Sequence, residues 1–142
     1  MTIRQHTTLL LTFATVGLLL QGCGPKVSGP GTRLFEADFK GAAKSCDSPK
    51  ATTTPGMITE STMKMGSDGG WCGLSTSNGG RPFDTERLTA RPEHGKVYVH
   101  RVGNDTRMDY TPDAGYAGTD SFTVQLLPGE ASVHVTVTST PR

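Results

Sequence analysis

The sequence predicts an all-β protein folded as a single antiparallel β-sandwich of about seven or eight strands. Short runs in which apolar and polar residues alternate are typical of strands with one buried face, and such runs recur along the chain. Clusters of glycine and proline separate them at intervals of about 8–12 residues, as in sandwich folds. No segment of the domain shows the periodicity of an amphipathic helix.

The N-terminal half of the domain carries the weaker strand signals. A first strand is indicated by three apolar side chains, Leu34, Phe35 and Phe39. Residues 44–57 (KSCDSPKATTTPGM) are rich in turn formers and are expected to be mostly loop. Residues 58–65 (ITESTMKM) alternate weakly, with Met63 and Met65 on the same face. A further strand is expected at residues 71–74, after a glycine-rich turn.

The C-terminal half alternates more clearly. The apolar residues that share a face in its four runs are Val97 and Val99; Met108 and Tyr110; Phe122, Val124 and Leu126; and Val133, Val135 and Val137. Between the last two runs, residues 127–130 (LPGE) have the composition of a tight turn. The last two strands are therefore expected to form an antiparallel hairpin.

The N-terminus has the composition of a secretory signal. Arg4 and His6 precede an uncharged run at residues 9–20, which is too short to span a bilayer as a helix. The run ends in Leu20-Gln21-Gly22-Cys23, which resembles the lipobox of bacterial lipoproteins. The resemblance implies that the signal is cut before Cys23, that the cysteine sulfur receives a diacylglycerol, and that the new amino terminus is acylated, for example with palmitate.

These features predict three regions: a signal peptide at residues 1–22, a flexible tether at 23–32 and the β-domain at 33–142. Glycine and proline dominate the tether (GPKVSGPGT after Cys23), which shows no periodicity. Lipidation implies attachment to a membrane of the bacterial cell envelope. Gly24 stands where some bacteria use an aspartate for inner-membrane retention, so the outer membrane is expected, facing the periplasm or the cell surface.

The charge balance narrows the range of partners. Arg4 is the only charged residue in the signal, and its removal from the 14 Lys and Arg leaves a number equal to the 13 Asp and Glu. A neutral chain without a basic stripe argues against nucleic acid or anionic lipid as the main ligand. Membrane attachment would then come from the acyl chains. No cofactor is expected, and the remaining partner is an unidentified envelope protein or glycan.

The three cysteines also fit an exported protein. The lipobox assigns Cys23 to lipid and leaves Cys46 and Cys72 as a pair, for which a disulfide is expected outside the cytoplasm. The loop of about 26 residues that it closes would stabilise the domain by about 3 kcal/mol. A reactive or metal-binding thiol pair is the alternative. Hydrophobic residues make up only 34% of the chain, so a covalent link would support a thin core.

The C-terminal half carries a recognisable series of motifs: Pro92-x-His94-Gly95-Lys96-Val97, then Asp109-Tyr110-Thr111-Pro112, then residues 115–124 (GYAGTDSFTV), and a last strand of alternating valines. This series resembles the C-terminal part of bacterial Ig-like and cadherin-like tandem-repeat domains. The resemblance covers about 46 residues and implies an Ig-like β-sandwich, while it says little about function. Those domains occur in long arrays on surface proteins, whereas a single copy is present here.

The turn and corner residues of this region have physical roles of their own. Pro112 and Gly115 shape the turn after the Tyr110 strand, and Gly118 allows a positive φ or a close backbone approach. Asp120 is placed to accept backbone N–H groups in a tight corner. The aromatic core of the corner is expected to consist of Tyr110, Tyr116 and Phe122.

Two groups of residues suggest metal binding. Asp105, Asp109, Asp113 and Asp120 suggest calcium, but they lack a closely spaced acidic run and are better explained as turn residues. Soft-metal binding, with Cu(I) as the ion, is the second possibility, and its ligands would come from Met57, Met63, Met65, His94, His100 and His134. The simpler interpretation is that Met63 and Met65 pack into the core, and no metal site is assigned.

Trp71, the single tryptophan, is the candidate recognition residue. Beside Cys72 it is expected to pack against the disulfide in the core, and if exposed it would instead be a binding hot spot. The chain lacks the common nucleophile, zinc-protease and phosphate-loop motifs, so no catalytic residue is assigned.

The resulting expectation is a lipid-anchored envelope protein with a structural or binding role. The alternatives are a periplasmic copper-binding protein and a small envelope enzyme or enzyme inhibitor, with contacts in the loop at residues 74–82.

Overall fold

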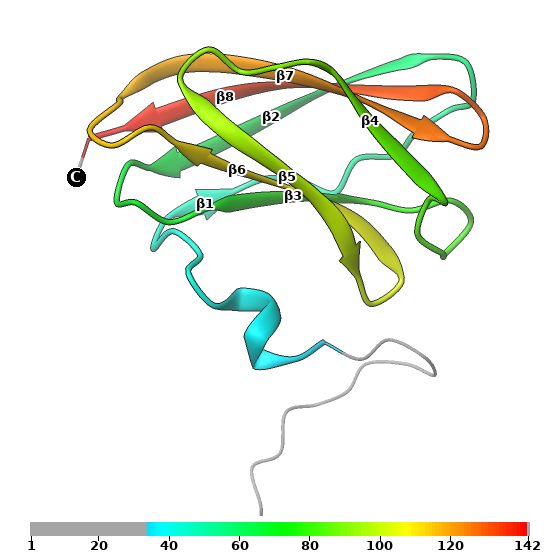
Figure 1. Ribbon diagram of the computed structural model, residues 1–142, viewed down its shortest axis with the longest axis horizontal. Helices are drawn as coiled ribbons and strands as arrows, with labels where there is room; N and C mark the ends of the chain where they lie inside the picture. The colour runs from blue at the N-terminus through cyan, green and yellow to red at the C-terminus, as the bar shows by residue number, and fades with distance from the viewer. Residues whose placement is uncertain (1–33, 142) are drawn as a thin grey trace, which may run out of the picture.

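The computed structural model of the protein describes residues 34–141. The predicted signal peptide, the tether and Cys23 therefore lie outside the described residues. Eight strands form two facing sheets, as predicted for an all-β sandwich (Figure 1). The strands are β1 (Cys46–Asp47), β2 (Ile58–Gly66), β3 (Cys72–Thr76), β4 (Thr85–Ala90), β5 (Gly95–Val102), β6 (Asp105–Pro112), β7 (Gly118–Leu127) and β8 (Ala131–Thr140).

The strand order is β1-β2-β8-β7-β4 in the five-stranded sheet and β3-β6-β5 in the three-stranded sheet. Strands β7 and β8 form the predicted hairpin. One pairing departs from the antiparallel expectation, because β2 runs parallel to β8 over its whole length. Parallel neighbours need a long connection. Here strands β3 to β7 supply it, so the first long strand of the domain lies beside the last.

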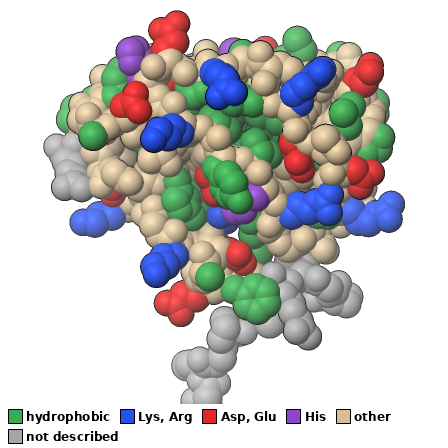
Figure 2. Space-filling view, in the orientation of Figure 1, with side chains coloured by type: hydrophobic (Ala, Val, Ile, Leu, Met, Phe, Trp, Pro, Cys, Tyr) green, Lys and Arg blue, Asp and Glu red, His purple; other side chains and the backbone are tan. Residues whose placement is uncertain are grey.

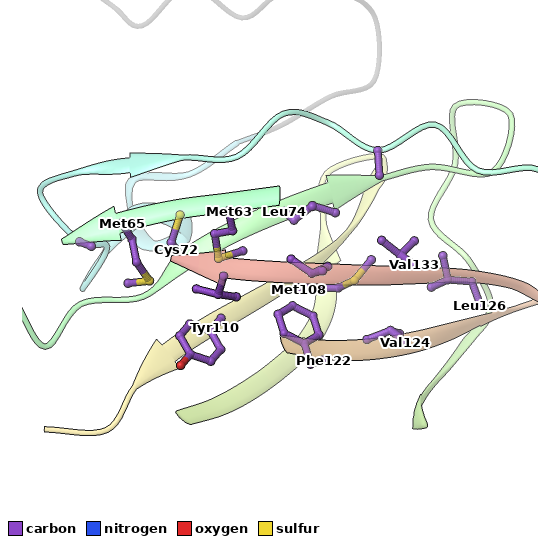
Figure 3. Close-up of a cluster of buried hydrophobic side chains, with 14 of the residues drawn as sticks. Met63, Met65, Cys72, Leu74, Met108, Tyr110, Phe122, Val124, Leu126 and Val133 are labelled. Carbon is purple, nitrogen blue, oxygen red and sulfur yellow. The ribbon is translucent and has the colours of Figure 1, made fainter. Parts of the chain in front are cut away.

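The core lies between the two sheets and consists of the alternating side chains that the sequence predicts (Figure 3). Phe122, Val124 and Leu126 of β7 are fully buried, and so are the three valines of β8. Met63 and Met65 of β2 are buried with them, whereas Thr59 and Ser61 on the same face of the strand are polar and only half-buried. The alternation of β2 is weak because only its second half enters the core. The rings of Tyr110 and Phe122 stack with centroids 6.1 Å apart.

A disulfide joins Cys46 to Cys72, as predicted. It links β1, at the edge of the five-stranded sheet, to β3 of the three-stranded sheet. Cys72 is completely buried, whereas Cys46 is exposed. The bond therefore fastens the segment before β2 to the core.

Two parts of the chain differ from the sequence prediction. Leu34, Phe35 and Phe39 do not form a strand; they flank or end a short 3-10 helix, η1 (Glu36–Phe39), which has no buried residue. The Asp38 carboxylate accepts the N–H of Phe35 at 2.7 Å and closes this turn. Strand β4 was not predicted, because its sequence TERLTA is mostly polar and it lies at a sheet edge.

Asp120, near the start of β7, organises the corner at that end of the strand. Its buried carboxylate accepts the N–H groups of Glu93 and His94 at 3.0 and 2.9 Å, and that of Ser121 at 2.8 Å. The hydroxyl of Tyr110 donates to the same carboxylate at 2.9 Å. Asp120 thus ties the connection before β5, strand β6 and strand β7 together.

The other corner residues take related positions. Gly115 has φ +79°, which shapes the turn after β6, and Pro112 ends that strand. At Gly118 a Cβ atom would lie 2.8 Å from the Tyr116 hydroxyl, so only glycine fits there without a shift. The expectation that Tyr116 belongs to the core is wrong: its ring is only half-buried and stacks on His94, with centroids 4.2 Å apart.

The contacts of Asp120 determine its ionisation. Burial raises the pKa of its carboxyl, but the three backbone N–H groups and the Tyr110 hydroxyl outweigh burial, so the pKa lies below its ordinary value. The pKa of Tyr110 is raised, first by burial and then by the hydrogen bond to Asp120 and the charge of its carboxylate. The pair is therefore an ionised carboxylate with a neutral phenol at all ordinary pH values.

We expect Asp120→Asn to destabilise the domain at pH 7 by about 2–3 kcal/mol, because the charged acceptor of several hydrogen bonds is lost. Because the folded pKa is depressed, this stabilisation is complete above the unfolded pKa of about 4 and is lost as pH falls further. Urea unfolding of both proteins between pH 7 and pH 2 measures the effect. A constant difference in unfolding free energy over that range would contradict the assignment.

Candidate binding cleft

The outer face of the three-stranded sheet carries a buried pair of opposite charges. Arg107 and Asp109 alternate along β6 with Met108 and Tyr110, which point into the core, so their side chains point away from it. Side chains on such a face normally meet water. Arg107 and Asp109 are nevertheless only 7% and 6% exposed.

Two residues of the neighbouring segment account for this burial. The ring of Trp71 lies over the guanidinium of Arg107, with 4.3 Å between the guanidinium carbon and the ring centroid. Gly73 of β3 lies opposite Asp109 in the sheet register, where a Cβ atom would come within 2.5 Å of the carboxylate. The absent side chain of Gly73 thus gives the charged pair room to lie against β3.

The charged pair has a third member on β5. Arg107 Nη2 donates to Asp109 Oδ2 at 3.0 Å, and Arg107 Nε lies 2.8 Å from Oδ1 without the alignment of a hydrogen bond. His100 Nε2 lies 2.8 Å from the same Oδ2. The carboxylate of Asp109 therefore orients a guanidinium on one side and an imidazole on the other.

These residues form the floor of a cleft of about 600 Å³. One wall comes from the segment around η1 and the other from β5. Figure 2 shows this face, with hydrophobic and histidine side chains near its centre and Lys and Arg around them. The cleft is lined by Ala37, Asp38, Lys40, Trp71, Lys96, Val97, Tyr98, His100, Arg107, Asp109 and Thr111.

The side chains at the rim are suited to contact a partner. Tyr98 is 66% exposed, and its ring lies 4.7 Å from that of His100. Lys40 and Lys96 add exposed cations, and Asp38 adds an anion. A few convergent polar groups beside aromatic rings are typical of recognition sites. Flat apolar rings beside fixed charges suit a sugar ring with its hydroxyls, or a peptide with a polar side chain.

Trp71, the candidate recognition residue, lies in this cleft and not in the core. The expectation that it packs in the core is wrong, because Gly70 and Trp71 approach residues 41–43 on the outside of the sheet. Its indole Nε1 donates to the carbonyl of Lys40 at 3.0 Å. Trp71 thus fastens the segment after η1 and covers Arg107 at the same time.

The four candidate aspartates do not come together. Asp105 pairs with Lys50 at 2.6 Å, Asp113 lies in an exposed turn, and Asp120 holds the corner. The turn interpretation is wrong for Asp109, which lies within β6 in the ion pair described above.

The candidate copper ligands are also dispersed. Met63 and Met65 lie in the core, Met57 is exposed, and His134 contacts Thr123 at 2.9 Å. Between residues 34 and 141, no three His, Cys, Asp or Glu side chains are arranged to hold a metal ion. Of the loop at residues 74–82, the first part belongs to β3 and none of it lines the cleft.

Tyr98, Lys96 and Arg107 were not recognised from the sequence as site residues. The alternation of β5 and β6 places all three on the outer face, and this signal was present. The alternation does not reveal that the ring of Trp71, from a segment distant in the sequence, covers Arg107.

Two facing sheets with this strand order and a tyrosine-bearing corner define an immunoglobulin-like β-sandwich. A family profile described as bacterial Ig domain matches residues 47–140, and the chain belongs to that family. The resemblance seen in the C-terminal half therefore extends over nearly the whole described domain. No curated protein matches the chain.

Within residues 34–141, no helix has the length and apolar character needed to cross a membrane.

We expect Asp109→Ala to cost about 3–5 kcal/mol of unfolding free energy, because it leaves the Arg107 guanidinium buried without its counter-charge. The double variant Arg107→Met with Asp109→Leu removes both charges and should be close to neutral. Chemical denaturation of the three proteins measures both effects. An Asp109→Ala protein as stable as the parent would contradict this prediction, because it would mean that water screens the charge of Arg107.

Proposed function

We propose that this protein is a lipid-anchored, non-catalytic binding domain of the bacterial cell envelope, with the cleft beside Trp71 and Tyr98 as its contact surface. The partner is an envelope protein or a glycan. The observation that carries the proposal is the buried Arg107–Asp109 pair, with the half-buried His100 beside it, on the floor of an open cleft. Apolar residues of similar size would serve stability at least as well there.

Membership of the bacterial Ig domain family supports a structural or binding role. The fold itself does not specify a ligand, so the location of the site must come from the side chains. Anchoring is proposed from the lipobox Leu20-Gln21-Gly22-Cys23. The acyl chains would hold the domain at the outer membrane, which makes the N-terminal segment the side nearest the lipid.

Lipidation is tested by Cys23→Ser. We expect the variant to leave the membrane fraction and to lack the fatty acid, because the acylated sulfur is gone. Fractionation of cells with metabolic labelling by a palmitate analogue measures both properties. A variant that still sediments with membranes, or a parent protein without label, would contradict the anchor.

The contact surface is tested by placing a photo-crosslinking amino acid at Tyr98 in the parent protein in cells. A protein partner would give one discrete adduct, and a glycan partner would carry the protein into the insoluble cell-wall fraction. The matched control is the same crosslinker at Glu60, which is exposed on β2 of the other sheet.

Replacing Lys96 by Glu should weaken the adduct at position 98, because the charge at the rim is reversed while the core is untouched. Equal capture at positions 98 and 60, or no capture at either, would contradict the cleft as the contact surface.

A further inference from the structure

The segment around η1 exposes three large apolar side chains. Leu34 is 55% exposed, Phe35 60% and Phe39 55%. Together these three residues are called the N-terminal apolar patch below. Exposure of large apolar side chains to water is unfavourable. A group of them marks an interaction surface more often than isolated ones do.

The patch is held against the domain by specific contacts. The Asp38 carboxylate accepts the N–H of Phe35, which fixes the turn. The carbonyl of Lys40 accepts the indole N–H of Trp71 at 3.0 Å. The backbone N–H of Trp71 donates to the carbonyl of Gly41 at 3.1 Å. These bonds connect the turn to the residue before β3, so the aromatic side chains of the patch have a defined place relative to the sandwich.

We propose that the N-terminal apolar patch rests on the lipid bilayer and orients the domain on the membrane. This inference depends on the proposed anchor at Cys23. Ten residues lie between Cys23 and Leu34, and the eleven Cα–Cα steps that join the two span at most about 40 Å. A tether of the composition predicted for residues 23–32 has an average length of about 20 Å. The patch is therefore the described surface that is closest to the lipid along the chain.

Because the domain would already be tethered to the membrane, even a weak contact between the patch and the bilayer would orient it. A linked second contact is an intramolecular event with an effective concentration in the millimolar range for a short linker. Aromatic and leucine side chains insert readily at the boundary between lipid headgroups and acyl chains. Because the mature chain carries no net charge, the apolar contact would supply most of the attraction. Lys40, which is exposed and directly follows Phe39 in the chain, adds a cation next to the patch that could meet headgroup phosphates.

The chain offers a matched comparison surface. Met57 and Ile58 are 60% and 65% exposed, slightly more than the side chains of the patch. Ile58 begins β2 and Met57 directly precedes it, at the end of the strand that Figure 1 places far from η1. If exposure alone caused lipid contact, both surfaces would show it.

The test uses the protein of residues 23–142 with the Cys46–Cys72 bond intact. Its Cys23 thiol is coupled to a maleimide phospholipid in phosphatidylcholine vesicles that contain a photoactivated carbene lipid. Peptide mass spectrometry after irradiation locates the labelled residues. We expect residues 34–39 to be labelled several-fold more than residues 57–58.

Two double variants serve as controls, and neither touches the core. Phe35→Ser with Phe39→Ser should reduce the label at Leu34 and Ala37 to the level of residues 57–58. Met57→Ser with Ile58→Ser should leave the label on the patch unchanged. Labelling of the patch no stronger than that of residues 57–58, or unchanged in the Phe35 and Phe39 variant, would overturn the proposal. A dimer that forms through the patch and shields it from lipid would also overturn it.

Chemical coupling replaces cellular acylation in this experiment. A protein that is not acylated in cells, but whose patch is labelled in vesicles, would refute the anchor while it supports the lipid preference of the patch. An acylated protein with an unlabelled patch would leave the anchor intact and refute the orientation.

Discussion

The carboxylate of Asp120 holds the two sheets together at one end of the sandwich. No cation of residues 34–141 pairs with it, and four hydrogen-bond donors from three parts of the chain compensate its charge. A buried charge tolerates little displacement of its donors, because each lost bond leaves it less solvated. The position of β5, the orientation of the Tyr110 ring and the stacking of that ring on Phe122 all follow from this constraint.

The second buried carboxylate, Asp109, has a different setting. It lies on the outside of the three-stranded sheet, where a sandwich has no second layer to cover it. The segment from η1 to Trp71 supplies a partial cover, held by backbone bonds at Ala43 and Trp71 and by the disulfide. The cover leaves the side toward Tyr98 open. The N-terminal segment therefore creates the cleft, whose two walls are the segment around η1 and strand β5.

The sequence was sufficient for the strands that obey a simple alternation. In β7 and β8, valine, phenylalanine and leucine at every second position define the buried face without any other information. It was insufficient for Phe35 and Phe39, whose spacing suits a turn closed by Asp38, and for β4, a polar strand at an edge. For the cleft, alternation placed Arg107 and Asp109 outward. Their burial depends on Trp71 and Gly73, and no local pattern relates these residues to β6.

The position of the disulfide also determines how the domain bears a mechanical load. Tension along the N-terminal segment first meets the hydrogen bonds of residues 40–43 to Trp71. Beyond these it reaches Cys46 and crosses through the sulfur atoms to Cys72, in the opposite sheet. Strand β2 belongs to the loop that this bond closes, so the pull bypasses it. While the disulfide is intact, tension from the N-terminus therefore does not run along β2 to its nine registered pairs with β8. Reduction would transfer the same tension to β2, and a domain moored at its N-terminus would then resist extension through hydrogen bonds instead of a covalent bond.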